Sequence, residues 1–478
     1  MTAARSADSH SAATPDPRRW AALGVALLAV FMDLVDTTIV LIAAPAMQLD
    51  LKAGYSSTQW VIAAYSLALG LGLITGGRLG DIVGRKRMFL AGVAVFTAAS
   101  ALCAVAPDIG ALIAARVVQG AGAAMMVPQV LATIQVGFSP AERPKAFGLY
   151  GAVTGLAAAA APVVGGMLVG SNVLGLEWRS VFWLNLPVGL FSLVAGAVLM
   201  RESRSADRPR LDLPGVAVVT AGLLLLLHPL IQGPESGWPA WAWLMMAASA
   251  PILVYFVRYQ ASRERVGDPL VPLSLFGSRS FVAGLIAALV MFSAVASFFM
   301  VLTIQLQIGH GFSALEVGLI FTAWPIGLAT TSGVAVRFVA RKGRALISIG
   351  ALLLTAAMVA LNATIGVAGG DIGGWDLVPA LFTGGVGFGL VAPILVDMVL
   401  SSVPPNAAGA ASGVTNTVIQ VAGSAGVAIV GALFTTFLGH TGDFDTATQW
   451  ALWYPVAAFA LGFVLSRGLP ASAHPTGR

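Results

Sequence analysis

Three ionisable residues lie within long apolar stretches of this chain, where charged side chains are costly. Asp33 and Asp36 belong to the stretch that begins near residue 20, and Arg116 belongs to the stretch that begins near residue 109. Since residues three apart share one face of a helix, the two carboxylates are expected on the same face. A carboxylate can take up and release a proton, and an arginine can hold a carboxylate in its ionised form. These residues therefore predict proton transfer in an apolar environment.

The depths of these residues predict which carboxylate carries the proton. At a rise of about 1.5 Å per residue, Asp33 lies roughly 16 Å from the outer end of its stretch, Asp36 roughly 12 Å and Arg116 roughly 10 Å. Asp36 and Arg116 are therefore expected to pair. Desolvation and a second carboxylate favour the protonated form of an acid, whereas a neighbouring arginine favours the ionised form. Asp33 is thus the predicted proton carrier, coupled to Asp36 and Arg116. The alternative is a purely structural pair of acids.

Other polar residues in the apolar stretches are candidates for lining a substrate cavity. Asn416 and Gln420 are four apart and share a helix face, where they either line a cavity or form hydrogen bonds between helices. Asp397 follows Pro393 and is either a cavity residue or an interfacial one. The predicted cavity residues are Asp33, Gln119, Asn185, Asp397, Asn416 and Gln420.

The composition and the lengths of the apolar stretches place the chain in a membrane. Charged residues make up only 10% of its 478 residues, whereas soluble proteins have about 25%. The stretches are roughly 20 residues long, which is enough for a helix to span a bilayer. We predict an all-α polytopic membrane protein whose fourteen spans lie near residues 20–44, 57–79, 87–106, 109–136, 144–170, 179–200, 214–232, 240–258, 281–307, 314–337, 345–367, 377–401, 408–437 and 447–467.

The placement of lysine and arginine predicts the orientation of these spans. Of the 26 basic residues, all except Lys52, Arg116 and Arg179 fall on the cytoplasmic side when both termini are cytoplasmic. We interpret the basic residues as topology signals rather than as a nucleic-acid-binding surface. The expected setting is a bacterial cytoplasmic membrane, with the lipid bilayer as a partner and no nucleic acid.

The sequence offers little for catalysis or for cofactor binding. Cys103 is the single cysteine, and the five histidines have no metal-ligand spacing. The sequence has no phosphate-binding loop with Lys-Ser/Thr, so ATP is not expected to drive the protein. We predict no catalytic residue, no metal site and no cofactor, and hence no enzyme.

A glycine-rich basic turn joins the second and third spans. It reads Gly-Arg-Leu-Gly-Asp-Ile-Val-Gly-Arg-Lys-Arg from Gly77 to Arg87 and resembles the signature turn of the major facilitator superfamily. Asp81 is expected to pair with a basic residue or to cap the next helix. The resemblance implies a role in gating for Gly77, Asp81, Gly84, Arg85 and Lys86.

Further motifs resemble the 14-span drug:proton antiporter subfamily of multidrug-resistance exporters. Arg116 lies in a segment similar to the intramembrane arginine motif, and Asp36-Thr-Thr-Ile-Val resembles the first-span acidic motif, to which this chain adds Asp33. Segments 178–189 and 409–426 resemble the sixth and thirteenth spans. The fifth span resembles the exporter hinge, although Ala161 replaces the usual glycine, and the hinge residues are Gly155, Pro162, Gly165 and Gly166.

The resemblance implies a major facilitator fold of two six-helix bundles plus two inserted helices. The expected domains are a disordered tail (1–19), a first bundle (20–200), a linker with two extra helices (201–265), a second bundle (266–467) and a second tail (468–478). It also implies a monomer that exchanges hydrophobic drugs, cationic ones included, for protons by alternating access. One alternative is a proton-coupled importer of a small nutrient on the same fold. Another is a membrane-embedded lipid-modifying enzyme.

Overall fold

The computed structural model describes residues 17–139, 142–170, 175–204, 211–233, 236–266, 269–369, 372–401, 403 and 408–469. Within these ranges every regular element is a helix, and fourteen helical segments are long and apolar enough to cross a membrane. The predicted fourteen spans are therefore confirmed. The two predicted tails lie mostly outside the described residues, which begin at residue 17 and end at residue 469.

The first six spans form an N-terminal bundle. It contains α1 (Arg19–Asp50), α2 (Tyr55–Val83), α3 (Arg85–Ala104), α4 (Ile109–Gly137), α5 (Arg143–Gly170), the short helices η2 (Glu177–Arg179) and α6 (Ser180–Trp183), and α7 (Asn185–Leu199). Helix α4 packs on α2 and α3, and α1 packs on α5 and α7. Helices suit this setting because each satisfies its own backbone hydrogen bonds where no water is available.

The remaining spans form a hairpin and a C-terminal bundle. The hairpin is α8 (Leu213–Gln232) and α9 (Ala240–Val266). The C-terminal bundle contains η3 (Leu273–Gly277), α10 (Arg279–Ile304), the π-helix η4 (Gln305–Gly309), α11 (Ala314–Phe321), α12 (Ala323–Ala368), α13 (Gly374–Ser401), α14 (Ala408–Thr441) and α15 (Phe444–Ser466). Helix α12 includes parts of two predicted spans, which meet at a kink where Lys342 is non-helical.

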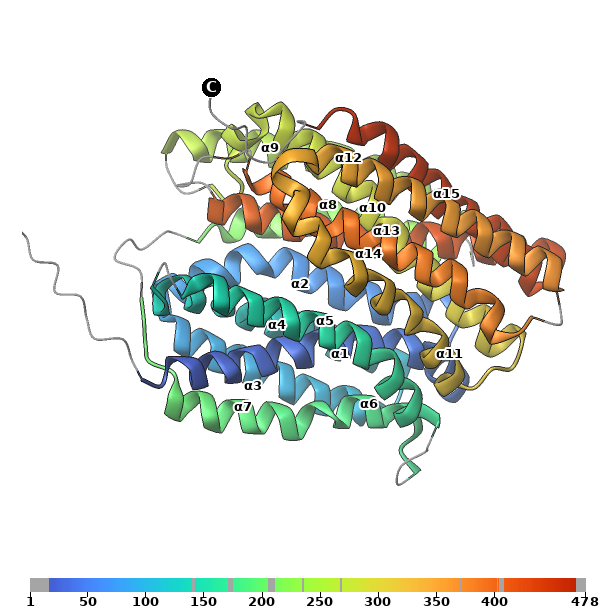
Figure 1. Ribbon diagram of the computed structural model, residues 1–478, viewed down its shortest axis with the longest axis horizontal. Helices are drawn as coiled ribbons and strands as arrows, with labels where there is room; N and C mark the ends of the chain where they lie inside the picture. Colours follow the sequence, from blue (N-terminus) through green and yellow to red (C-terminus); the bar gives the residue numbers. More distant parts are fainter. Residues whose placement is uncertain are drawn as a thin grey trace, which may run out of the picture.

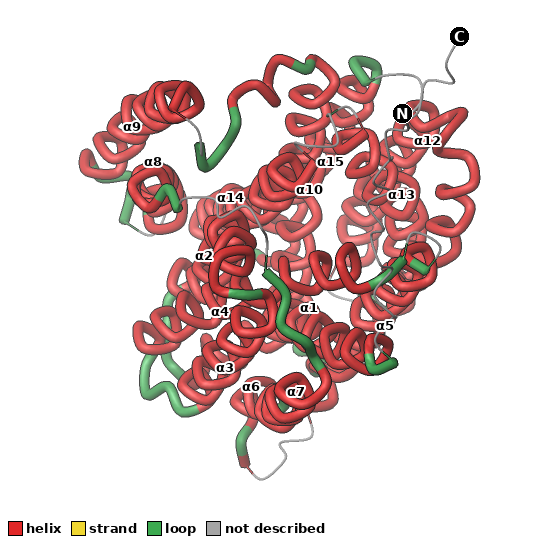
Figure 2. Tube along the Cα trace, turned by 90° about the vertical axis from the view of Figure 1, so that its left-hand side faces the viewer, coloured by secondary structure: helices red, strands yellow, loops and turns green. Residues whose placement is uncertain are grey.

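The helices run side by side along the length of the molecule (Figure 1). Helix α1 begins and α15 ends at the same end, on the left in Figure 1, where the α2–α3 turn also lies. We call this end the basic end and the opposite one the far end. The two bundles meet where α2 packs on α14 and where α5 packs on α11. Viewed along the helices, α8 and α9 lie outside both bundles, next to α14 and α2 (Figure 2).

Candidate proton and substrate site

The centre of the N-terminal bundle holds a buried ion pair between α1 and α4. The Arg116 Nη1 donates to Asp36 Oδ2 at 2.6 Å. The other carboxylate oxygen, Oδ1, accepts from Asn185 Nδ2 at 2.7 Å and from Gln119 Nε2 at 3.0 Å. The expected pair is therefore present. Asp36 accepts from three N–H donors, so both of its carboxylate oxygens have hydrogen-bond partners.

Arg116 is anchored on several sides. Besides the bond to Asp36, its Nη1 donates to Gln119 Oε1 at 2.7 Å, and its Nε donates to the carbonyl oxygen of Val61 at 3.1 Å. The side chain is 1% exposed. A charged residue at the centre of a membrane helix costs about 2.5–3.5 kcal/mol on insertion scales. The bonds to Asp36, Gln119 and α2 offset that cost by satisfying the buried guanidinium.

Asp33 lies one helical turn before Asp36 and has different surroundings. Its Oδ1 accepts a hydrogen bond from the Tyr65 hydroxyl of α2. Among the described residues, Tyr65 is the one side chain seen to donate to it. The Tyr65 ring in turn lies against Arg116, whose guanidinium carbon is 4.0 Å from the ring centroid. Tyr65 thus connects the Asp33 carboxylate to the ion pair, and the Asp36–Arg116 contact does not involve Asp33.

The predicted cavity residues separate into two groups. Gln119 and Asn185 are both buried and belong to the ion-pair network. Asn416 and Gln420 lie on α14, where Asn416 is exposed and Gln420 is half-buried. Asp397 is half-buried on α13. The structure therefore gathers Gln119 and Asn185 with Asp33 and Asp36 in the N-terminal bundle, and places the other three in the C-terminal bundle.

The α2–α3 turn at the basic end is tied to the end of α7. Arg85 Nη2 donates to Asp81 Oδ1 at 2.8 Å, so Asp81 pairs with a basic residue as expected. Gly84 adopts a φ of 120°, and a Cβ there would lie 2.4 Å from a Glu202 carboxylate oxygen. Glu202 accepts from the Lys86 backbone N–H at 3.2 Å and so helps to cap α3. Gly77 lies in α2 near Pro128.

The predicted exporter hinge forms the α5–α11 contact near the far end. A Cβ at Gly166 would lie 2.6 Å from the Ala314 carbonyl oxygen, and one at Gly318 would lie 2.2 Å from the Pro162 carbonyl oxygen. The backbones of the two bundles touch here because neither glycine has a side chain. Gly165 lies against Ile39 of α1. In contrast, a Cβ at Gly155 would meet no atom within 4 Å.

A second contact between the bundles lies in the same half of the molecule. Gln307, in the π-helix that follows α10, donates from Nε2 to the carbonyl oxygen of Ile42 in α1 at 2.9 Å. Its neighbour Gln305 donates to Asp445 at 2.9 Å, and the His310 Nε2 lies 2.6 Å from the same carboxylate oxygen. The π-helix therefore connects α15 of one bundle to α1 of the other.

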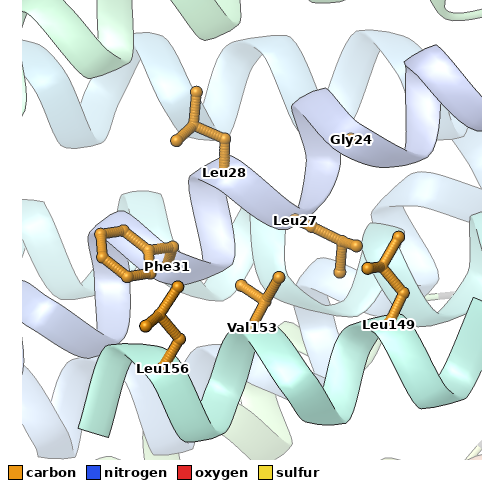
Figure 3. A pocket seen from close by; sticks show the side chains of 7 residues that line it. All are labelled: Gly24, Leu27, Leu28, Phe31, Leu149, Val153 and Leu156. Carbon is orange, nitrogen blue, oxygen red and sulfur yellow. The ribbon is translucent and has the colours of Figure 1, made fainter. Parts of the chain in front are cut away.

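An apolar pocket opens between α1 and α5 in the half nearer the basic end. It has a volume of about 360 Å³, and Gly24 and Leu28 complete its lining. Leu27 and Phe31 of α1 line one side of it (Figure 3). Leu149, Val153 and Leu156 of α5 form the opposite wall, and Leu156 is 61% exposed. This pocket lies within the N-terminal bundle, and the two bundles also meet in this half, where a Cβ at Gly413 of α14 would lie 2.9 Å from Ile74 of α2.

Several residues of this site were missed by sequence reasoning. Tyr65 is a lone tyrosine in an apolar span, and Gln307 lies at the end of another. Glu202 is an acid beside a cluster of arginines, which is the one signal that could have indicated a pairing role. Their partners lie on helices distant in sequence, so local patterns do not identify them.

Comparison with known proteins shows which family this chain resembles. A family model described as the Major Facilitator Superfamily matches residues 26–427. The probable actinorhodin transporter of Streptomyces coelicolor is 43% identical over 433 residues, which cover 90% of this chain and 75% of the relative. The tetracenomycin C resistance and export protein of Streptomyces glaucescens is 35% identical over 434 residues, which cover 88% and 77%.

A solved structure shows that the fold is shared. A POT family transporter in complex with a thioalcohol-conjugated peptide superposes with a TM-score of 0.68 at 13% identity, over 92% of this chain and 94% of that chain. The family model and the relatives describe transporters, which argues against the alternative of a lipid-modifying enzyme. The chain belongs to the Major Facilitator Superfamily, and within it to a family of drug exporters.

Proposed function

We propose that the protein exports hydrophobic drugs or antibiotics across the bacterial cytoplasmic membrane in exchange for protons. The basic end faces the cytoplasm in this proposal, because lysine and arginine are retained on that side. The names of two relatives, a probable actinorhodin transporter and a tetracenomycin C resistance and export protein, support export of antibiotics. The apolar pocket between α1 and α5 supports a hydrophobic cargo.

The observation that supports coupling of transport to protons is that Asp33 is not part of the Asp36–Arg116 ion pair. Asp36 is held by Arg116, Gln119 and Asn185, whereas Asp33 is held by the neutral hydroxyl of Tyr65. A proton on Asp33 removes one negative charge from the centre of the N-terminal bundle. Moving one charge through 100 mV is worth about 2.3 kcal/mol, which is enough to bias a conformational equilibrium.

The exchange follows from alternating access between the two bundles. In one conformation of this proposal, the α5–α11 contacts close the far end, and the drug enters from the cytoplasm past the apolar pocket of the N-terminal bundle. Separation of these contacts then exposes the site to the outside. There the drug leaves and a proton binds Asp33. Return to the first conformation releases the proton to the cytoplasm.

The test uses everted membrane vesicles from a pump-deficient host, with an acidic lumen and ethidium as a fluorescent substrate. Asp33→Asn carries no proton, so we expect it to reach normal expression and to lose all uptake driven by the pH gradient. Asp108→Asn is the matched control, since asparagine also caps a helix and this acid begins α4 outside the site. Wild-type uptake by Asp33→Asn would remove Asp33 from the mechanism, and a symporter would instead expel substrate from these vesicles.

A further inference from the structure

Six aromatic side chains form a continuous cluster inside the C-terminal bundle. We define the aromatic cluster as Phe292, Phe298, Phe299, Phe321, Trp324 and Phe388, which come from α10, α11, α12 and α13. The Trp324 ring lies at its centre, with centroid distances of 5.0 Å to Phe298, 5.4 Å to Phe299 and 5.8 Å to Phe388. Phe292 lies 5.4 Å from Phe388 at an angle of 71°. These are the separations and tilts at which aromatic rings attract one another.

Three rings of the cluster are buried, and the other three are partly accessible. Phe298, Phe321 and Trp324 are buried. Phe292, Phe299 and Phe388 are only half-buried, and all three pack on the apolar core of the bundle. The partly accessible rings pack on the buried rings and are therefore rigid, which limits the conformational entropy lost when a ligand binds.

The accessible rings of α10 lie on the side of that helix that faces the N-terminal bundle. Just after α10, Gln307 of the π-helix donates a hydrogen bond to Ile42 of α1, so this end of α10 lies against the N-terminal bundle. Phe292 and Phe299 are seven residues apart, which is about two helical turns, so they lie on one side of α10. Ala296, between the two phenylalanines, packs on the core cluster that contains Ile39 and Val40 of α1.

The two bundles thus contain different chemistry. The N-terminal bundle contributes the acids and Arg116, whereas the C-terminal bundle contributes aromatic rings. Gln119 and Asn185, which were predicted to contact the substrate, are already hydrogen-bonded to Asp36 and buried. A ligand that makes no hydrogen bonds is therefore expected to bind more favourably to the aromatic cluster than to these two amides.

We propose that the aromatic cluster binds the planar aromatic ring system of the transported compound by stacking on Phe292, Phe299 and Phe388. This inference rests on the proposed function of drug export and adds a substrate class to it, namely compounds with planar aromatic rings. It also separates the two tasks of the protein, because proton exchange occurs in one bundle and ring recognition in the other. Movement of the bundles then couples the two events.

The test measures binding of 1-aminoanthracene, a neutral planar fluorescent amine, to the full chain in lipid nanodiscs. Phe299→Leu and Phe388→Leu keep an apolar side chain and remove the ring. We expect each to raise Kd about three- to tenfold. Phe388→Tyr retains a ring and is expected to keep wild-type affinity. Phe437→Leu is the matched control, since it removes a ring that stacks on Trp450 at 5.1 Å elsewhere in the bundle.

A second ligand separates ring stacking from general damage to the site. 1-Adamantanol is a neutral apolar cage without an aromatic ring, so its Kd, measured by calorimetry, is expected to change less than twofold in the leucine variants. Equal weakening of both ligands, or unchanged binding of 1-aminoanthracene by the leucine variants, would overturn the stacking site while leaving drug export standing. If the wild type neither binds nor exports any tested compound, the proposed function itself fails.

Discussion

Asp33 and Asp36 are one helical turn apart, yet they differ in the donors around them. Asp36 accepts from nitrogen donors of Arg116, Gln119 and Asn185, and Asp33 accepts from the hydroxyl of Tyr65. Asp36 is therefore surrounded by a guanidinium and two amides, whereas Asp33 has one phenol beside it. The position of Tyr65 between Asp33 and Arg116 gives a physical route by which a proton on one acid affects the other.

Breaking the ion pair is expected to be costly because each partner is buried. Asp36→Asn or Arg116→Gln leaves an unpaired buried charge, which we expect to lower the free energy of unfolding by about 3–5 kcal/mol. The double variant removes both charges and is expected to recover part of that loss. Thermal unfolding of the purified variants in detergent measures these differences. Additive losses in the double variant would show that the two side chains are not coupled.

A surface ion pair allows a prediction about pH. Arg19 Nη2 lies 2.6 Å from Glu142 Oε1 and so ties the start of α1 to the residues just before α5. Hydrogen bonds from Arg19 and Ser139 hold the pKa of Glu142 below its usual 4.5. A lowered pKa in the folded state means that the stabilisation is present above pH 4.5 and is lost as the pH falls below it.

Glu142→Gln is therefore expected to lower the thermal unfolding midpoint at pH 7 relative to the wild type. The two proteins should converge when the pH falls well below 4.5, because the wild-type carboxyl is then neutral as well. Melting curves of both proteins across this pH range provide the measurement. A difference that persists unchanged at low pH would mean that the charge of Glu142 does not contribute.

At the level of the helices, the α5–α11 contact holds the two bundles together near the far end. Gly166 and Gly318 bring two backbones together near the far end, and Pro162 supplies the carbonyl that faces Gly318. Nearer the basic end, α5 instead presents Leu149 and Leu156 to the apolar pocket. The same helix therefore contacts the C-terminal bundle near one end and lines the apolar pocket toward the other.

A methyl group at this contact should disturb the closed far end. We expect Gly318→Ala to reduce transport at least tenfold, since its Cβ would lie 2.2 Å from the Pro162 carbonyl oxygen and force the helices apart. Gly155→Ala lies on the pocket-lining half of α5, meets no atom within 4 Å and is the matched control. Ethidium uptake in everted vesicles compares them, and equal activity would show that the contact is not part of the gate.

At the scale of the whole molecule, the α8–α9 hairpin has polar contacts of its own, apart from those of the two bundles. The α8–α9 hairpin lies beside the α2–α14 contact (Figure 2) and is held together by Asp212, which accepts from Tyr259 at 2.9 Å and from Gln260 at 2.8 Å. Asp212 and both partners lie at the ends of α8 and α9 nearer the basic end, so these hydrogen bonds join the two helices of the hairpin to each other. The bundles can move relative to each other without breaking these bonds.

The proposed orientation of the whole molecule is directly testable. Since the basic residues gather at one end, a green fluorescent protein fused after Leu469 should fold and fluoresce in the cytoplasm, and alkaline phosphatase at the same position should be inactive. Insertion after Gly442, in the turn between α14 and α15, should give the opposite pair of results. The reverse pattern at both positions would invert the orientation and with it the proposed direction of export.

Much of the fold could be predicted because it depends on properties local to the sequence. Apolar runs of bilayer length predict the fourteen spans, and equal depth predicts the pairing of Asp36 with Arg116, which the structure confirms. The division of span 10 between α11 and α12, and the continuation of α12 into the next span, could not be predicted. Short breaks and kinks such as that at Lys342 leave little trace in hydropathy.

The sequence by itself determined which residues lie in the membrane, at what depth and in which order. Only the tertiary structure decided which of them are neighbours, because the rotation of each helix about its axis is set by packing against helices far away in the chain. That rotation places Tyr65 on Asp33, and Gln119 and Asn185 on Asp36. It also assembles the aromatic cluster from four helices, whose separate aromatic residues have no common pattern in the sequence.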